Sequence, residues 1–123
     1  MDAIEDPIVV LAGKEWPVPR LAPRQNRVVV PALLKLIPRI LLARAESVAA
    51  QESNLAYLSR FIDEPTYEQL AAVAFTALTR AHPELTRSEF DEMPIDTLEL
   101  IASVSVIARQ AGLLRAVTAK PQE

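Results

Sequence analysis

Residues 28–42 read VVVPALLKLIPRILL, the densest apolar stretch of the chain. Its apolar side chains cover most sides of a helix, and a helix of that kind is buried on most sides. Pro23 precedes it and favours a helix start, because the first helical turn needs no N–H at that position. The sequence therefore predicts a helix over residues 22–50. Pro31 and Pro38 predict a kink or break within it, since a proline ring clashes with the preceding turn.

The same stretch is the one candidate for a membrane span. It is about 15 residues long, shorter than the roughly 20 residues that cross a bilayer, and it contains Lys35 and Arg39. Residues 1–6 are acidic, which is the wrong sign for the start of a secretory signal. We therefore expect no membrane role and a cytoplasmic location.

Residues 8–18, IVVLAGKEWPV, predict an N-terminal β-hairpin. A run rich in β-branched residues is followed by a glycine turn and a second run that contains Trp16. Pro17 and Pro19 end the second strand, because proline has no N–H for the ladder. A two-stranded hairpin alone is marginal in water, so it must pack on a helix or join another chain's sheet.

Start and stop signals divide the rest of the chain into helices. Asp63 before a proline predicts a helix over 65–82, and residues 46–62 are interpreted as a helix end or a second short helix. The T-R-S-E box at 86–89 opens a short helix through residue 93. Asp96 begins a last helix over 96–111, which ends at a glycine and carries a wide apolar arc.

Together these patterns predict one small α+β domain over residues 1–123. It is mostly helical, with about four helices over 22–112 and the hairpin over 8–18 at its N-terminal side. Residues 1–6 and 115–123 are expected to be flexible, because they offer little to bury.

Composition argues against most enzyme chemistry. The chain has no cysteine, one histidine and two glycines, so thiolate metal sites, zinc sites with paired histidines and glycine-rich phosphate loops are excluded. His82 stands at a predicted helix end, where a positive charge is favoured for structural reasons. The adjacent acids at 63–64 and 91–92 do not face each other on a helix. We expect a non-enzymatic protein with no catalytic residue, no metal ligand and no cofactor.

Charge is divided unevenly along the chain. Residues 14–44 contain seven basic residues and one acid, whereas residues 46–99 contain eleven acids and three arginines. One interpretation is that the two segments fold against each other and their charges pair. Another is that the basic segment binds an acidic partner segment or nucleic acid. Nucleic acid is the weaker choice, because no aromatic residues are interleaved with the basic ones to stack on bases.

The apolar content also allows two interpretations. The apolar helices either form the core of a compact monomer or leave an exposed face for a helical partner or for self-association. The partner-binding hypothesis places the contact surface on the central stretch, with Lys35 and Arg39 as polar contacts beside five apolar residues: Val30, Leu33, Leu34, Ile37 and Leu41.

Three segments carry a resemblance to a known family. They are IVVLAGKEWPV at 8–18, RLAPRQNR at 20–27, and LTRSEFDEMP at 85–94 followed by a helix that ends ARQAG at 108–112. In this order they resemble the tail assembly chaperones of long-tailed bacteriophages and related prophages. In that family a strand–Gly-Lys-Glu–strand hairpin precedes a loop with proline and a helix that begins with polar residues.

The resemblance implies a non-enzymatic protein of the host cytoplasm that is absent from the mature virion. It would bind the long helical tape measure protein, shield its apolar segments, help to recruit tail tube subunits and self-associate as a homo-oligomer. Two alternatives stay open. The first is another small phage structural or head–tail interaction protein, and the second is a nucleic-acid-binding regulator that uses the segment 20–44.

Overall fold

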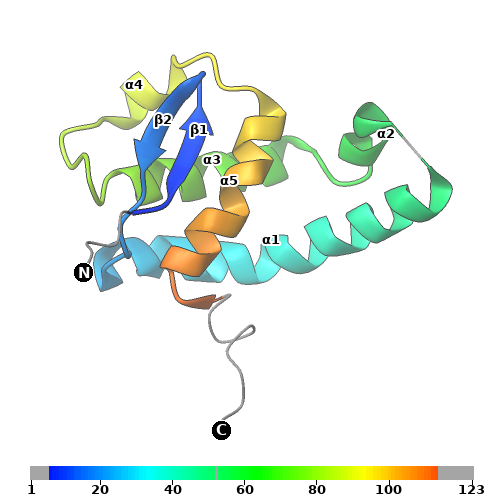
Figure 1. The fold of residues 1–123 in the computed structure, drawn as a ribbon, viewed down its shortest axis with the longest axis horizontal. Coiled ribbons are helices and arrows are strands. Elements are labelled where there is room, and N and C mark those ends of the chain that lie inside the picture. The colour runs from blue at the N-terminus through cyan, green and yellow to red at the C-terminus, as the bar shows by residue number, and fades with distance from the viewer. Residues whose placement is uncertain (1–5, 52, 114–123) are drawn as a thin grey trace, which may run out of the picture.

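A 28-residue helix, α1 (Pro23–Ala50), runs along the whole molecule (Figure 1). The computed structural model describes residues 6–51 and 53–113. In chain order its elements are β1 (Ile8–Leu11), β2 (Lys14–Pro17), α1, α2 (Asn54–Ser59), α3 (Glu64–Leu78), α4 (Arg87–Asp91) and α5 (Thr97–Gln110). Of these, α2, α3 and α5 contact α1, and the hairpin packs on α5.

The predicted α+β class with an N-terminal hairpin is confirmed. The described residues form five helices instead of about four, because residues 54–59 make the second short helix that the sequence allowed. Flexibility was predicted for residues 1–6 and 115–123, and all of these except Asp6 lie outside the described residues. Within the described part, no helix combines the length and the apolar character that crossing a membrane requires.

The break predicted in the long helix does not occur, because α1 continues through both Pro31 and Pro38. The two prolines are seven residues apart, so they share one face of the helix, and both are exposed. Because proline has no N–H, the carbonyl of Arg27 lacks the donor that residue 31 would supply, and the carbonyl of Leu34 lacks the donor that residue 38 would supply. On an exposed face water can hydrogen-bond those carbonyls, which explains why the helix tolerates the prolines.

The hairpin turns through Ala12 and Gly13, both with positive φ, at 57° and 72°. Positive φ at both central residues is the geometry of a type I′ turn, which suits the twist of the two strands. The predicted first strand is thus one residue shorter, since Ala12 belongs to the turn. Val9 and Leu11 are buried and pack the hairpin into the main core, so the hairpin lies against helices as expected.

Glu99 on α5 holds this turn in place. Its carboxylate accepts hydrogen bonds from the backbone N–H groups of Ala12 at 2.9 Å and Gly13 at 3.2 Å, and from Asp96 N–H at 3.0 Å. The bond from Asp96 contributes most, and with those from Ala12 and Gly13 it holds the pKa of Glu99 below its usual range. One side chain therefore joins the hairpin turn to the start of the last helix.

Substituting Glu99→Gln is expected to lower the free energy of unfolding at neutral pH. The free energy of unfolding of this variant should also fall less steeply as the pH is lowered. A carboxyl group with a lowered folded-state pKa contributes stability that is present above its unfolded-state pKa and is lost as the pH falls through the folded-state pKa. Urea unfolding of both proteins between neutral and acid pH measures this. The pKa of Asp63 is also lowered, by its bonds from Thr66, but that group is common to both proteins. Parallel curves for the two proteins would contradict the assigned role of Glu99.

The main core lies where the hairpin, the first half of α1, α3 and α5 meet. Its fully buried large side chains come from every one of these elements: Leu11, Val18, Val29, Leu33, Leu36, Leu70, Val73, Leu78, Leu100 and Ile107. A smaller cluster of Ala43, Tyr57 and Phe61 joins the second half of α1 to α2 and the residues after it. The second half of α1 is therefore held by this cluster and by Ile37 and Ile40, which pack against the main core.

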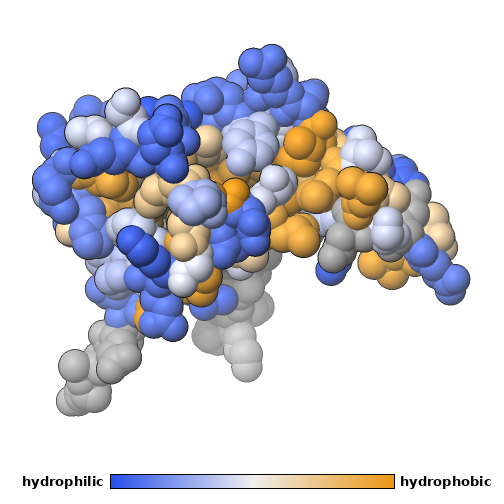
Figure 2. Space-filling model, turned by 90° about the horizontal axis from the view of Figure 1, so that it is seen from above, coloured by the Kyte–Doolittle hydropathy of each residue, from blue (hydrophilic) through white to orange (hydrophobic). Residues whose placement is uncertain are grey.

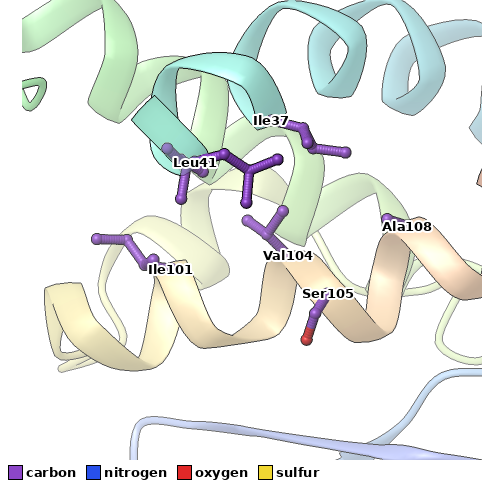
Figure 3. Close-up of a pocket in the computed structure, with 7 residues that line it drawn as sticks. Ile37, Leu41, Ile101, Val104, Ser105 and Ala108 are labelled. Atoms are coloured by element: carbon purple, nitrogen blue, oxygen red, sulfur yellow. The ribbon is translucent and has the colours of Figure 1, made fainter. Parts of the chain in front are cut away.

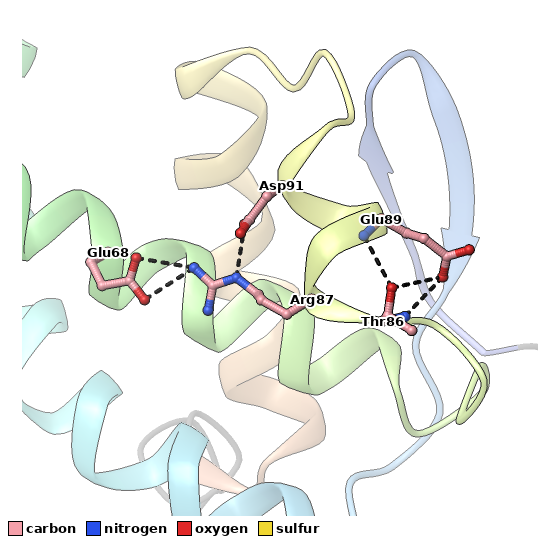
Figure 4. Close-up of polar contacts among 5 residues, drawn as sticks. All are labelled: Glu68, Thr86, Arg87, Glu89 and Asp91. Carbon is pink, nitrogen blue, oxygen red and sulfur yellow. Dashed lines mark hydrogen bonds and ion pairs between the residues drawn. The ribbon is translucent and has the colours of Figure 1, made fainter.

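Local signals place the starts of the later helices. The Asp63 side chain accepts the Thr66 N–H at 2.9 Å at the start of α3, as predicted. Thr86 and Glu89 form the predicted capping box before α4, at 3.1 Å and 2.9 Å (Figure 4). Arg87 then joins α4 to α3 through Glu68 (Figure 4).

The predicted helix ends are less accurate than the starts. The helix predicted over 65–82 ends at Leu78, where the Thr79 hydroxyl donates to the Thr76 carbonyl at 2.6 Å. The short helix predicted through residue 93 ends at Asp91. The last helix ends at Gln110, before Gly112, whose φ of 94° agrees with the expected glycine stop.

Candidate functional site

An apolar hollow of about 200 Å³ opens between α1 and α5. Ile37 and Leu41 project into it from α1, and Ile101, Val104 and Ala108 project from α5 (Figure 3). Ser105 also lines the hollow, but its hydroxyl points away from Leu41 (Figure 3). The wall is thus almost entirely aliphatic.

A second hollow of about 420 Å³ adjoins the first and extends it toward α2. It shares Ile40, Leu41 and Ile101 with the first hollow and ends at Arg44 and Tyr57. We call the two together the α1–α5 groove. Its lining consists of Ile37, Ile40, Leu41, Arg44, Tyr57, Leu98, Ile101, Ala102, Val104, Ser105 and Ala108.

Large apolar side chains beside this groove are exposed to solvent. Leu41 is 63% exposed and Leu98 is 43% exposed, although both line the groove. Leu34 and Val48, at 61% and 65% exposure, lie one heptad before and after Leu41, so they continue the same flank of α1. Figure 2 shows hydrophobic residues gathered in the centre of the upper face and over the end that carries α2. Exposed apolar side chains gathered in one region are the feature by which candidate interaction sites are selected.

The seven predicted partner-binding residues fall into three groups: four lie on one flank of α1, one is exposed outside the groove, and two stabilise the fold. Leu34, Ile37 and Leu41 lie on the α5-facing flank of α1, with Val30 half-buried on the same flank. Lys35 is exposed but does not line the groove.

Two of the predicted contact residues serve the fold instead. Leu33 is fully buried, because its position on α1 faces the main core, so its assignment to the partner surface is wrong. Arg39 lies on the opposite flank, where its guanidinium donates to the Thr66 hydroxyl at 2.8 Å and to the Phe61 carbonyl at 3.2 Å. These bonds join α1 to the start of α3 and leave Arg39 turned away from the groove.

The contribution of α5 and α2 to the groove was not predicted from the sequence. Leu98, Ile101 and Ala102 form one wall of the groove, and Tyr57 closes its end. The wide apolar arc of the last helix could have indicated this wall, because it exceeds the surface that one neighbouring helix covers. Nothing in the sequence indicated that Tyr57 lies beside Arg44, because that contact depends on how α2 folds back against α1.

The two oppositely charged segments do not pair in the described part of the chain. Its ion pairs are Arg60–Glu46, His82–Glu84, Arg87–Glu68 and Arg87–Asp91, and all these residues belong to the acidic segment 46–99. Arg39 nevertheless contributes, after the hydrogen bonds from Thr66, to the lowered pKa of Asp63, so the charges of the two segments complement each other at that point without forming an ion pair. On α1, Lys35 and Arg44 are exposed, whereas Arg39 is occupied by its bonds to Thr66 and Phe61.

His82 and Tyr57 both pack against other side chains of the fold. The ring of His82 packs edge-on against Trp16, with 5.3 Å between ring centroids. Burial raises the pKa of the Tyr57 hydroxyl, and the nearby charge of Arg44 partly opposes this. Among the described residues, no three acids or histidines are grouped so as to hold a metal ion. The geometry thus defines an apolar groove with one cation at its end.

No protein-family model, curated protein or solved structure matches this chain.

Proposed function

We propose that the protein is a non-enzymatic assembly chaperone that holds an apolar helical segment of a longer partner in the α1–α5 groove. The observation that carries this proposal is the groove itself, whose lining is aliphatic apart from Arg44, Tyr57 and Ser105 and includes the exposed Leu41 and Leu98. A surface of this kind gains free energy when apolar area of a partner covers it.

A helix suits this groove better than an extended segment. Both long walls are helices, and their lining side chains recur at helical spacing, at 37, 40, 41 and 44 on α1 and at 98, 101, 105 and 108 on α5. The eleven residues from Leu98 to Ala108 span about 15 Å, which is about three helical turns of a partner. Ala102, Ser105 and Ala108 are small, so a partner helix can approach α5 closely.

The resemblance to phage tail assembly chaperones supplies the identity of the partner in this proposal. It is the tape measure protein, a long helical chain whose apolar segments need shielding before tail assembly, with the tail tube protein as a further partner. In the same proposal the protein acts in the host cytoplasm, self-associates and is absent from the mature virion.

Leu41→Asp is expected to abolish co-purification with a tape measure fragment, whereas Leu42→Asp preserves it. The two leucines are adjacent and equally exposed, at 63% and 62%, but only Leu41 lines the groove. An aspartate at 41 places a charge in an apolar contact, which is costly without a partner charge. The measurement is co-expression with fragments of the tape measure protein encoded beside this gene, followed by affinity purification.

Circular dichroism of both variants controls for folding, and both are expected to unfold at the temperature of the unsubstituted protein. Equal capture by the two variants would contradict docking in the groove. The absence of any tape measure gene beside this one would contradict the phage identity of the partner.

A further inference from the structure

We infer that Arg44 makes the α1–α5 groove selective for helices that carry a carboxylate beside it. The inference rests on the proposed function and adds the chemistry of the partner. Arg44 is the one charged residue in the lining of the groove, at the end formed by α2. A helix that fills the groove must therefore place some side chain next to this guanidinium.

Arg44 is held in position without a carboxylate partner. Its guanidinium carbon lies 5.0 Å from the centroid of the Tyr57 ring, a cation–π contact. That ring is itself fixed, because Tyr57 is 5% exposed and packs against Phe61 with 5.3 Å between ring centroids. Among the described residues Arg44 makes no ion pair, and it is exposed to solvent.

The nearest acid along α1 does not neutralise Arg44. Glu46 lies on the other flank of the helix and pairs with Arg60 at 3.1 Å. No Asp or Glu lines either hollow of the groove. Water solvates Arg44 in the open groove, and an occupant that covers the guanidinium removes that water at a cost unless it supplies a carboxylate.

An arginine fork binds a carboxylate with two parallel hydrogen bonds, and a guanidinium fixed on a ring loses little freedom in doing so. A lysine on the partner at the same place would be repelled. Discrimination therefore comes from attraction and repulsion at a single position, while the aliphatic walls supply affinity for any apolar helix.

The test uses the full chain and three synthetic amphipathic peptides of about 20 residues, long enough to form helices. All three peptides have the same apolar face of leucine and alanine. They differ only at the positions that flank each end of this face, where one peptide carries Glu, one Gln and one Lys. Fluorescence anisotropy at low salt measures the dissociation constants. The Glu peptide is expected to bind about tenfold more tightly than the Lys peptide, and the ratio should shrink as salt rises.

Arg44→Gln is expected to bring the ratio of the two dissociation constants close to one, and Arg44→Glu to reverse the order of the peptides. Lys35→Gln is the matched control. It removes a cation from the exposed surface of the same helix but outside the groove, so the ratio should stay as in the unsubstituted protein. Thermal unfolding of the three variants verifies that each is folded.

An unchanged ratio in Arg44→Gln, with binding still lost in Leu41→Asp, would overturn the role of Arg44 and leave the groove as the docking site. Failure of all three peptides to bind would count against the proposed function itself. A dimer that Leu41→Asp converts into a monomer in sedimentation experiments would show that a second copy fills the groove, and would overturn the inference of an acidic partner helix.

Discussion

Replacing Leu33 by alanine is expected to lower the free energy of unfolding by about 2–5 kcal/mol, whereas the same change at Leu34 alters it by about 0.5 kcal/mol or less. The two leucines are neighbours in one helix. Leu33 is fully buried in the main core, and Leu34 is 61% exposed. Truncating Leu33 leaves a cavity that the surrounding side chains fill only in part, and truncating Leu34 leaves none.

Urea unfolding followed by circular dichroism measures both changes, with the same helix and the same substitution as an internal control. Equal losses at the two positions would mean that Leu34 is also covered in the folded protein. In that case the flank of α1 that carries Leu34 would not be exposed to solvent, and the groove beside it would not be open to a partner.

Substituting alanine for Pro31 or Pro38 is expected to raise the free energy of unfolding by about 1–3 kcal/mol at each position. Proline in a helix interior is about 3 kcal/mol less favourable than alanine, and the greater freedom of the unfolded alanine chain offsets part of the gain. Both prolines are exposed, so removing the ring costs little burial. Each substitution also restores a donor to the helical hydrogen-bond ladder.

Thermal unfolding of the two single variants and the double variant measures this gain. The two sites are seven residues apart on the exposed face, so their effects should add. A loss of stability in either variant would contradict the placement of that proline on the solvent side of α1.

Local chemistry in the sequence was enough to place most element starts. An aspartate cap at residue 63, a capping box at 86–89 and a glycine at the hairpin turn each act within one turn of the chain, and the structure contains all three. Helix ends depend on tertiary contacts as well. The sequence therefore placed the end of α3 four residues too late, at 82 instead of Leu78.

The prolines of α1 show where local reasoning was insufficient. A proline ring was expected to break the helix, but the cost depends on which face the freed carbonyls occupy. Pro31 and Pro38 lie on the face turned from the core, and the aliphatic residues of the opposite face hold the helix together. The tertiary packing of α1 thus outweighs its local propensity.

Of the residues that line the candidate site, the sequence pointed to Ile37 and Leu41. The apolar density of residues 28–42 correctly indicated α1, but it could not separate Leu33 in the core from Leu34 and Leu41 on the surface. That separation depends on where α3 and α5 pack. The opposite wall on α5 and the pairing of Arg44 with Tyr57 join residues far apart in sequence, so only the folded structure reveals them.

The central claim is that a partner helix occupies the α1–α5 groove, and methyl NMR of the full chain tests it most directly. Titration with a tape measure fragment is expected to shift the methyl signals of Ile37, Leu41 and Ile101, which line the groove, and to leave those of Leu42 and Val28 in place. Shifts confined to Leu42 and Val28, with the groove methyls unchanged, would contradict the claim.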